Sequence, residues 1–573
     1  MNTSGASTPQ PSDLPASSYR SSPADTHTVI NQPPLLPDFD AFSSNVALAE
    51  AVEVFGGPAA STGLSKLGTL AGSVEARQWG VDANVNLPVL HTHDRHGNRI
   101  DEVSFHPAWH QLMGQAVAAG LHAAPWASED QAAHVTRAAG FLTWSQVEAG
   151  HGCPISMTYA IVPALAVDPA IRDRWLPGLA SATYDFGLRS PQRKAGLIAG
   201  MAMTEKQGGS DVRANTTVAT PTDDGGYTLA GHKYFVSAPM GDVYLMLAQA
   251  PGGLTCFVVP RVLDDGTRNV FRIQRLKDKV GNRSNATSEV ELSNTWAVRL
   301  GDEGRGVRTI VEMVSATRLD CVLGSAAIMR AALVEAIWHA RHRQAFGRLL
   351  SDQPLMQAVL ADLALETEAA TWLGLRLAQA TDRAVGAQAG ADAEVEASLR
   401  RIALPAGKYF VCKRTPMMVA EALECLGGPG YMEDSPMPRL YREAPVNSVW
   451  EGSGSVNALD LLRALARNPE TLDAWLTTVG IARGVNPNFD AALDDLLATF
   501  GEGTATAEAN ARRLAERLTL ITQAALLLEH APDFVSDSFC ATRLSPTRTG
   551  CTFGTLPDGM PVRRIIDRAF PEI

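Results

Sequence analysis

The stretch MTEKQGGSDV (residues 203–212) stands where this 573-residue chain changes in character from helical to β. After it come the runs YTLAGHKYFVS, VYLMLAQA and LTCFVVP, which are rich in β-branched and aromatic residues. The turn-forming stretches DDGG, PMGD and PGG flank these runs, and the strands of a small antiparallel sheet or barrel are typically bounded in this way. The sequence therefore predicts a β-domain over residues 200–303.

Apolar residues on both sides of this β-domain recur at helical spacing. Residues 108–124 and 131–149 show that spacing most clearly before the β-domain. Beyond it, residues 309–343 could hold two helices of one bundle, and residues 354–381 a third. We therefore expect an α+β fold with five parts: a disordered tail over residues 1–25, an N-terminal helical domain over 26–199, a β-barrel over 200–303, a helical bundle over 304–467 and an additional helical domain over 468–573.

Charge and composition limit the classes of function. The formal net charge of −12 argues against a surface built throughout to neutralise phosphates, although it allows one basic face. The seven cysteines include no CxxC pair, so we expect no zinc ribbon, no disulfide framework and a reducing, cytoplasmic environment. HTHDRH (91–96) precedes Gly-Asn and is interpreted as a solvated turn, so we predict no metal site. We expect no signal peptide, and no uninterrupted apolar stretch approaches the roughly 20 residues that span a membrane.

The loop MTEKQGGSDV carries residue types that can surround a ligand. Thr204, Gln207 and Ser210 supply polar side chains around the backbone amides of Gly208 and Gly209. Such an arrangement can bind a planar polar ring or a phosphate. The same residues also make an ordinary turn before a strand, so this motif alone leaves both interpretations open.

Two further segments indicate a bound aromatic ring and a general base. Phe235 and Ser237 are two apart on the predicted strand and share a face, where an aromatic wall and a hydroxyl would suit a flat ring. Glu451, within residues 441–455, has mostly uncharged neighbours, which raise the pKa of a carboxyl group and favour a general base. A core Phe with a solvated Ser, and a surface Glu, are the alternatives. Because no G-x-G-x-x-G or P-loop signature occurs, a dinucleotide would need another architecture.

The order of several short motifs resembles that of the acyl-CoA dehydrogenase family. TEKQGGSD, GHKYFVS, RQAFG followed by Gln353, LECLGGPGY, YRE and WEGSGS are similar to its signatures, over roughly residues 110–465. FHPAWH, VEAGHGCPISMTYA and LKDKVGNRSNA further resemble its adaptive alkylation-response branch, whose members carry an additional C-terminal helical domain. The resemblance implies an acyl-CoA dehydrogenase-like fold, FAD held between the domains, a homotetramer built as a dimer of dimers, and DNA binding with weak dehydrogenase activity.

The resemblance also implies roles for individual residues. Glu451 would take the α-proton of an acyl thioester, while the β-hydrogen leaves as hydride to N5 of the flavin. Thr204 would bind the flavin ring, Ser210 the pyrophosphate, and Phe235 and Ser237 the ring face and N5. The implied cofactor contacts are Met203, Thr204, Gln207, Ser210, Phe235, Val236, Ser237, Arg343, Phe346, Gln353, Gly427, Gly428, Asn447, Glu451, Gly452 and Ser453. The implied substrate pocket consists of Arg318, Arg442, Glu443 and Trp450.

Some positions depart from the family pattern. Thr317 stands before Arg318 where some branches place the base, so Glu451 is the family-type base that this chain offers. Glu443 replaces the usual Asp and adds a methylene close to the pocket wall. Phe235 replaces Trp, and serines replace two threonines, which are conservative changes. From Arg343 to Gln353, and again at Gly427–Gly428, the resemblance implies contacts with the FAD of a neighbouring subunit.

The arginines of the last hundred residues bear on the DNA hypothesis. Residues 471–573 hold nine arginines and no lysine against thirteen acidic residues, so there is no general basic surplus. Arg512, Arg513 and Arg517 could share one helix face and contact duplex DNA, or they could be solvated residues partnered by Glu508 and Glu516. Three functions therefore compete: a DNA-associated alkylation-response flavoprotein with weak dehydrogenation, a catabolic enzyme for a short or branched acyl-CoA, and an FAD-stabilised binding scaffold without turnover.

Overall fold

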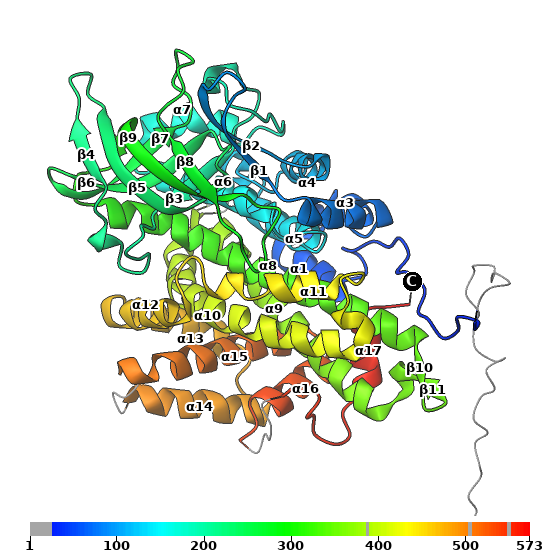
Figure 1. Ribbon diagram of the computed structural model, residues 1–573. Coiled ribbons are helices and arrows are strands. Elements are labelled where there is room, and N and C mark those ends of the chain that lie inside the picture. Colours follow the sequence, from blue (N-terminus) through cyan, green and yellow to red (C-terminus); the bar gives the residue numbers. More distant parts are fainter. Residues whose placement is uncertain (1–25, 386–388, 502–506, 547–551, 573) are drawn as a thin grey trace, which may run out of the picture.

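A computed structural model describes residues 26–385, 389–501, 507–546 and 552–572 (Figure 1). The tail predicted over residues 1–25 lies outside these ranges. A β-barrel occupies one end of the molecule, three long helices run through its middle, and the last helices of the chain lie against the far side of those three (Figure 1). The mixed architecture predicted from the sequence, with helices on either side of a barrel, is confirmed.

The N-terminal region is helical except for one hairpin. The sequence reading did not predict this hairpin, which consists of β1 (Val89–His93) and β2 (Arg99–Ser104) and encloses the His-rich turn. Asp94 accepts backbone hydrogen bonds from His96 and Asn98 and so closes the turn. The helices are α1 (Val46–Gly56), α2 (Leu64–Ala71), α3 (Val74–Val85), α4 (Pro107–Ala118), α5 (Ala133–Ser145), α6 (Gly152–Leu165) and α7 (Pro169–Leu179).

The β-domain closes into a barrel. Its strands are β3 (Ala199–Ala202), β4 (Val218–Pro221), β5 (Tyr227–Ser237), β6 (Val243–Ala250), β7 (Gly253–Pro260), β8 (Arg272–Leu276) and β9 (Thr287–Leu300). The path β6-β4-β5-β9-β7 returns to β6, because β6 also pairs with β7. The predicted antiparallel sheet or barrel is a barrel, but its strands are not all antiparallel: β3 and β4 both run parallel to β6, since neither is joined to it by a hairpin. Leu229, Val236, Met246 and Phe257 fill the barrel core.

The first helix of the bundle is longer than predicted. Residues 309–342 belong to a single 37-residue helix, α8 (Gly306–His342), and do not form two helices. The stretch has no proline, and Gly324 alone is too weak a breaker to end a helix that is packed on several sides. The other helices are α9 (Pro354–Val385), α10 (Ala393–Cys425), α11 (Met437–Glu443) and α12 (Gly454–Arg467). Within the described ranges, α8 alone has the length and apolarity of a membrane span, and it is mostly buried among α6, α9 and α10.

The last helices share an apolar core with the bundle. They are α13 (Glu470–Gly480), α14 (Pro487–Gly501), α15 (Ala511–His530), α16 (Asp533–Arg543) and α17 (Val562–Ala569). α15 packs on α10, and α17 packs on α9. Arg543 is paired with Glu366 at 3.1 Å, and Arg568 with Glu368 at 2.9 Å, so buried ion pairs tie α16 and α17 to α9. One continuous core therefore runs from α1 to Phe570.

Candidate active site

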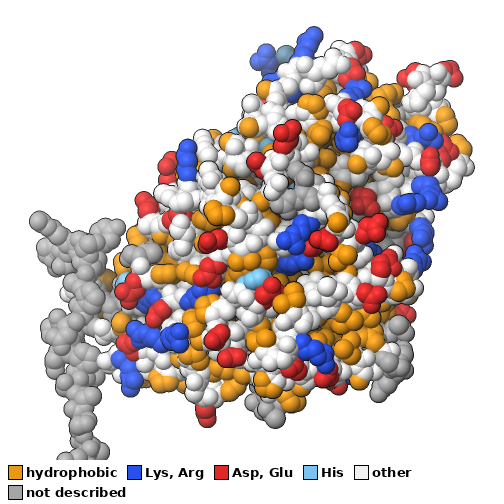
Figure 2. Space-filling model, turned by 180° about the vertical axis from the view of Figure 1, so that it is seen from behind, with side chains coloured by type: hydrophobic (Ala, Val, Ile, Leu, Met, Phe, Trp, Pro, Cys, Tyr) orange, Lys and Arg blue, Asp and Glu red, His pale blue; other side chains and the backbone are white. Residues whose placement is uncertain are grey.

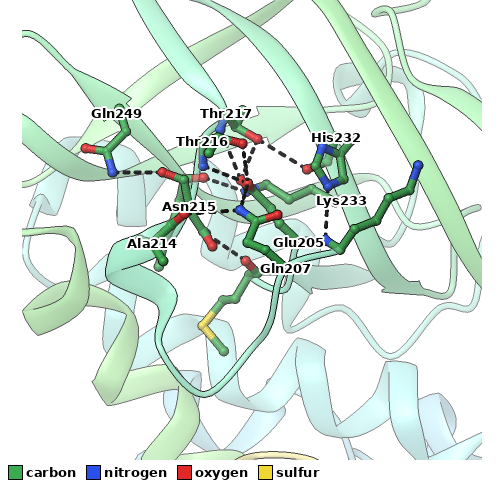
Figure 3. A network of polar contacts seen from close by, with 12 residues as sticks. Glu205, Gln207, Ala214, Asn215, Thr216, Thr217, His232, Lys233 and Gln249 are labelled. Atoms are coloured by element: carbon green, nitrogen blue, oxygen red, sulfur yellow. Dashed lines mark hydrogen bonds and ion pairs between the residues drawn. The ribbon is translucent and has the colours of Figure 1, made fainter.

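A buried ion pair organises the loop that the sequence singled out (Figure 3). Glu205 of that loop and Lys233 of β5 have fully buried side chains, and Nζ of Lys233 lies 2.8 Å from Oε1 of Glu205. Lys233 also donates to the carbonyl of Leu247 on β6 at 2.7 Å. Figure 3 shows Glu205 surrounded by the side chains of Gln207, Thr216 and Thr217. The pair therefore joins the loop to two strands of the barrel.

The carboxylate of Glu205 is saturated with hydrogen bonds. Beyond Lys233, it accepts the backbone N–H and hydroxyl of both Thr216 and Thr217 and the amide of Gln207. Burial acts to raise the pKa of Glu205, but Lys233 and these hydrogen bonds outweigh it and hold the pKa below its usual range. A carboxylate that stays ionised and is saturated with hydrogen bonds has a structural role. Sequence reasoning missed it, although a lysine on the same strand face as buried Leu229 signals a buried counterion.

The rest of the loop faces outward. The amide of Gln207 is committed to Glu205 and to the carbonyl of Ala214, at 2.8 and 3.1 Å. The carbonyl of Met203 accepts from Asn215 at 2.8 Å. Gln207 and Met203 therefore stabilise the loop through these bonds, whereas the sequence analysis expected both to contact the cofactor. The hydroxyl of exposed Ser210 has no partner among the described residues, nor has that of Thr204, so both remain available to a ligand.

The end of β5 presents a ring and a hydroxyl, as predicted. Phe235 is 49% exposed, and Nζ of Lys277 lies 4.5 Å from its ring centre. Val236, which was expected to touch the cofactor, points its side chain into the barrel core and can offer only its backbone. The hydroxyl of Ser237 lies 3.2 Å from that of Thr287, which accepts from Nζ of Lys279 at 2.9 Å. A bulge between Lys233 and Val236 reorients the end of this strand.

An unsatisfied polar atom lies beside this strand end. Oδ1 of Asn285 is buried and has no hydrogen-bond partner in the described part of the chain. The thiol of Cys153, at the start of α6, interacts with both Asn285 and Ser237. A buried acceptor without a donor is costly unless a ligand supplies one. A flavin offers a ring N–H and a flat apolar face, so Asn285 and Phe235 fit that cofactor.

Glu451 lies in a tight turn between α11 and α12. Its backbone φ is +57°, in the left-handed region, and Gly452 follows at +94°. Oε2 of Glu451 accepts a hydrogen bond of 2.7 Å from the hydroxyl of Thr317. Burial raises the pKa of the Glu451 carboxyl, whereas Thr317, Lys408 and Arg318 act to lower it. The net pKa lies above the usual range, as the sequence predicted.

The turn is held from behind by side chains of α8 and α10. Nε of Arg318 donates to the carbonyl of Glu451 at 3.1 Å, while its Nη1 is paired with Asp460 at 2.6 Å. The guanidinium of Arg318 is thus occupied by the turn and by Asp460, and that this residue also lines the substrate pocket stays a prediction. Nζ of Lys408 donates to the carbonyls on either side of Glu451. Lys408 was not selected from the sequence, where a lysine in a helix is usually a solvated residue.

The segment before Glu451 is fixed by its own side chains. Asn447 is buried, and its amide donates to the hydroxyl of Ser325 at 3.2 Å. The indole N–H of Trp450 donates to Oδ1 of Asn447 at 3.0 Å. Ser453 adopts an extended conformation at the start of α12. Asn447, Trp450 and Ser453 thus shape the turn, and the first two have polar atoms committed to protein partners.

Glu443 joins α11 to the loop between β8 and β9. Its carboxylate accepts the backbone N–H and the amide of Asn282, the latter at 2.8 Å. Burial, followed by the charge of Glu148, raises the pKa of Glu443 to about 7. Arg442 points away and is paired with Glu433, with a second contact of 3.0 Å. Glu443 therefore ties α11 to this loop, and the place of both residues in a substrate pocket stays a prediction. Glu148 and Asn282 are further residues that sequence reasoning missed.

Comparison with known proteins places these motifs in a family. Residues 31–186 match the family described as adaptive response protein AidB N-terminal domain, residues 200–295 the acyl-CoA dehydrogenase middle domain, and residues 304–466 the acyl-CoA dehydrogenase C-terminal domain. The chain is 45% identical to the putative acyl-CoA dehydrogenase AidB of Escherichia coli, over 92% of this chain and 95% of that protein. This chain belongs to the acyl-CoA dehydrogenase family.

Other members of the acyl-CoA dehydrogenase family share most of the fold. Acyl-CoA dehydrogenase family member 11 of Caenorhabditis elegans is 30% identical, over 82% of this chain and 80% of its own. The structure of Caenorhabditis elegans ACDH-11 in complex with C11-CoA superposes with a TM-score of 0.82 and 26% identity, covering 93% of this chain and 95% of that one. Proteins of the family bind FAD, and a relative from Bacillus anthracis, similar in fold alone at 17% identity, is complexed with it (TM-score 0.62, covering 81% of this chain and 86% of that one).

Five predicted cofactor residues of this acyl-CoA dehydrogenase family member lie far from Glu451. Figure 1 shows the hairpin of β10 (Gln344–Ala345) and β11 (Arg348–Leu349) at the opposite end of the bundle from α12. Phe346 at its tip is 97% exposed, with φ at +52°. The amide of Gln353 donates to the carbonyl of Ala345 at 2.9 Å and braces the hairpin. Arg343 is bonded to the carbonyl of Asn31, and the turn at Gly427 and Gly428 has open space around both residues. They do not join the site of their own chain.

The proposed DNA-contacting arginines do not form a free cluster. Nε of Arg512 donates to the hydroxyl of Tyr409 at 3.1 Å. Arg517 is paired with Asp495 of α14, a partner that the sequence reading did not name. Arg513 is exposed. On the face of the molecule shown in Figure 2, basic and acidic side chains are interspersed. Two of the three arginines are therefore engaged within the protein.

Proposed function

We propose that this protein is an FAD-containing oxidoreductase that removes the α- and β-hydrogens of an acyl thioester, with Glu451 as the base. The observation that carries the proposal is the state of Glu451: a partly buried carboxyl with a raised pKa and a single hydrogen bond, from Thr317, among the described residues. Such a group accepts a proton near neutral pH. FAD would supply the acceptor for the hydride when bound.

The residues of the candidate site would have the following roles. FAD would be held by the hydroxyls of Thr204 and Ser210, which have no partner among the described residues, by the hydroxyl of Ser237, by the exposed ring of Phe235 and by the unsatisfied oxygen of Asn285. An Oε atom of Glu451 takes the α-proton. The carboxyl becomes neutral in this step, and a partly buried site stabilises the neutral form.

The remote residues would serve a second subunit. We propose a homotetramer, a dimer of dimers, in which the hairpin carrying Phe346 and the turn at Gly427–Gly428 reach the FAD of a neighbour. The support is the exposure of Phe346, at 97%, together with the 83% exposure of Tyr431 close to that turn. Phe346→Asp should lower both the mass measured by light scattering and the affinity for FAD. A tetramer that keeps its FAD in this variant would rule out the contact.

Anaerobic bleaching of the flavin by a series of acyl-CoAs tests the activity. The purified protein, which we expect to be cytoplasmic, should be yellow. Its flavin should bleach with at least one member of a series that includes short, branched and medium-chain acyl-CoAs. Glu451→Gln should bind FAD equally and bleach far more slowly. A yellow wild-type protein that no acyl-CoA bleaches would instead support a binding scaffold without turnover, and a colourless protein that takes up no FAD would contradict the proposal.

The match to the adaptive response AidB domain supports a second function, association with duplex DNA in an alkylation response. Since Arg512 and Arg517 have protein partners, Arg513 is the contact to test. Arg513→Ala should weaken a DNA mobility shift for all sequences and reduce the salt slope by about 1. An unchanged shift would exclude this footprint, and no shift in the wild type at low salt would exclude the DNA role.

A further inference from the structure

Two buried cations bind the backbone around Glu451. Nζ of Lys408, on α10, donates to the carbonyl oxygens of Trp450 and Gly452 at 2.7 and 2.5 Å. Nε of Arg318, on α8, donates to the carbonyl oxygen of Glu451 at 3.1 Å. Three consecutive carbonyls are thus held by side chains from two different helices.

The burial of Lys408 calls for an explanation. The residue is 1% exposed, and its hydrogen-bond acceptors within the described ranges are these two carbonyls. Arg318, in contrast, is paired with Asp460, which also binds Arg401 at 2.8 Å. A buried ammonium without a bonded carboxylate is unfavourable. Its location directly behind the turn accounts for its burial.

The backbone at this turn is one that a side-chain-bearing residue rarely adopts. Glu451 has φ at +57°, and Gly452 has φ at +94°. An L-residue leaves the left-handed region unless its surroundings hold it there. The carbonyl groups and N–H groups of a trans peptide point in opposite directions. Binding the carbonyls toward α8 and α10 therefore fixes the peptide planes on both sides of Glu451, whose carboxylate meets the hydroxyl of Thr317 on α8 at 2.7 Å.

We propose that Lys408 is a positioning residue for α-proton abstraction: with Arg318, it clamps the carbonyls of residues 450–452 and so fixes where the Glu451 carboxylate points. The inference rests on the proposed function, since it takes Glu451 as the base. The ammonium of Lys408 also favours the ionised form of Glu451. The other titratable or charged groups that face Glu451 are Cys153 of α6, and Arg318 and Cys321 of α8.

Lys408→Met tests the clamp, because it keeps the length of the side chain and removes the ammonium. We expect flavin bleaching by acyl-CoA to slow about 100-fold, the loss typical of a misplaced catalytic group. As the pH is lowered, the bleaching rate should also begin to fall at a higher pH than in the wild type. The acyl-CoA concentration that gives the half-maximal rate should change less. Lys408→Arg should restore part of the rate. Lys66→Met, the same change at an exposed lysine of α2, is the control and should leave the rate unchanged.

Hydrogen exchange provides a readout that does not depend on turnover. In Lys408→Met holoprotein, amides of residues 449–457 should exchange faster, while those of β5 keep the wild-type rate. If Lys408→Met does not fold, Asp460→Asn releases the Arg318 half of the clamp and should slow bleaching several-fold. A Lys408→Met variant with the wild-type bleaching rate, pH dependence and hydrogen exchange would overturn the proposal. Faster hydrogen exchange together with an unchanged bleaching rate would also overturn it. A wild-type protein that never bleaches would refute the proposed function, and faster exchange would still support the clamp.

Discussion

Glu205 and Glu451 each lie close to a buried lysine, but the two lysines bind different groups. Lys233 binds the carboxylate of Glu205 directly at 2.8 Å. Lys408 binds the carbonyls that flank Glu451 and leaves its carboxylate to a single hydrogen bond, from Thr317, among the described residues. The pKa of Glu205 is held below its usual range, and that of Glu451 is raised.

The difference separates structure from chemistry. A carboxylate that receives six hydrogen bonds, as Glu205 does, has no free lone pair for a proton and no reason to titrate near neutral pH. A carboxylate with a fixed backbone and few partners can take a proton and release it. Glu443 lies between the two in its number of hydrogen bonds, with two from Asn282, and its pKa is about 7.

Substitution of Glu451 should give the largest effect. Glu451→Gln keeps the size and the hydrogen bond from Thr317 but removes the base. We expect the rate of anaerobic flavin bleaching to fall by about 10³- to 10⁴-fold, at the upper end of the range for a general base. Stopped-flow absorbance measures the rate, and the thermal midpoint should stay unchanged. Loss of FAD or of stability would instead make Glu451 a structural residue like Glu205.

Substitution of Lys233 should act on stability instead. Lys233→Met leaves Glu205 buried without its cation, and we expect the free energy of unfolding of the holoprotein to drop by about 3–5 kcal/mol. Urea unfolding followed by circular dichroism measures it. The double variant Lys233→Met with Glu205→Gln should recover much of the loss, because no unpaired charge remains. A double variant as unstable as the single one would show that the ion pair is not the cause.

Substitution of Glu443 should change how stability depends on pH. Its folded pKa of about 7 exceeds the unfolded value, so the folded state keeps a proton that the unfolded chain releases. Its contribution to stability is therefore complete below the unfolded pKa and is lost as the pH rises toward 7. Glu443→Gln should remove this loss, which we expect to be on the order of 2 kcal/mol between pH 5 and 7.5. Urea midpoints at the two pH values test it, and an unaltered pH slope would argue against the raised pKa.

Substitution of Thr317 should give the smallest effect. Thr317→Val removes the hydrogen bond that stabilises ionised Glu451, and so should raise the pKa of Glu451 further. Because bleaching needs the ionised base, the rate falls as the pH drops through that pKa, and this fall should move up by about one pH unit in the variant. A pH profile of the bleaching rate measures the shift. An unmoved profile would mean that another group controls it.

Local pattern was enough to predict several elements and the raised pKa of Glu451. β5 and β6 have the bounds that their β-branched and aromatic residues and turn signals predicted. The raised pKa of Glu451 followed from its uncharged neighbours along the chain. α8 was divided in two because a 37-residue core helix is rare, and periodicity alone cannot show that no break occurs. The β1–β2 hairpin was missed because its five- and six-residue strands lie within a helical region.

The supporting residues could not be predicted, because their partners are distant in the sequence. Lys408 and Glu451 are 43 positions apart, and Glu205 and Lys233 are 28 apart. Lys408 has no local signature that distinguishes it from a solvated residue, and the strand face that Lys233 shares with Leu229 does not show which residue is its partner. The bond of Arg318 to the Glu451 carbonyl was missed for the same reason, since it depends on how α8 packs against the turn. Sequence motifs therefore indicated the candidate site, whereas packing decides what holds it in place.

Exchange of the substrate α-proton with solvent tests the central claim most directly, because it isolates the base from the hydride transfer. Holoprotein in D₂O is mixed anaerobically with an acyl-CoA whose β-carbon cannot be oxidised, and deuterium at the α-carbon is followed by mass spectrometry. We predict steady incorporation by the wild type and almost none by Glu451→Gln with the same FAD content. Equal incorporation by the two proteins, or none by either while the acyl-CoA is shown to bind, would contradict the assignment of Glu451 as the base.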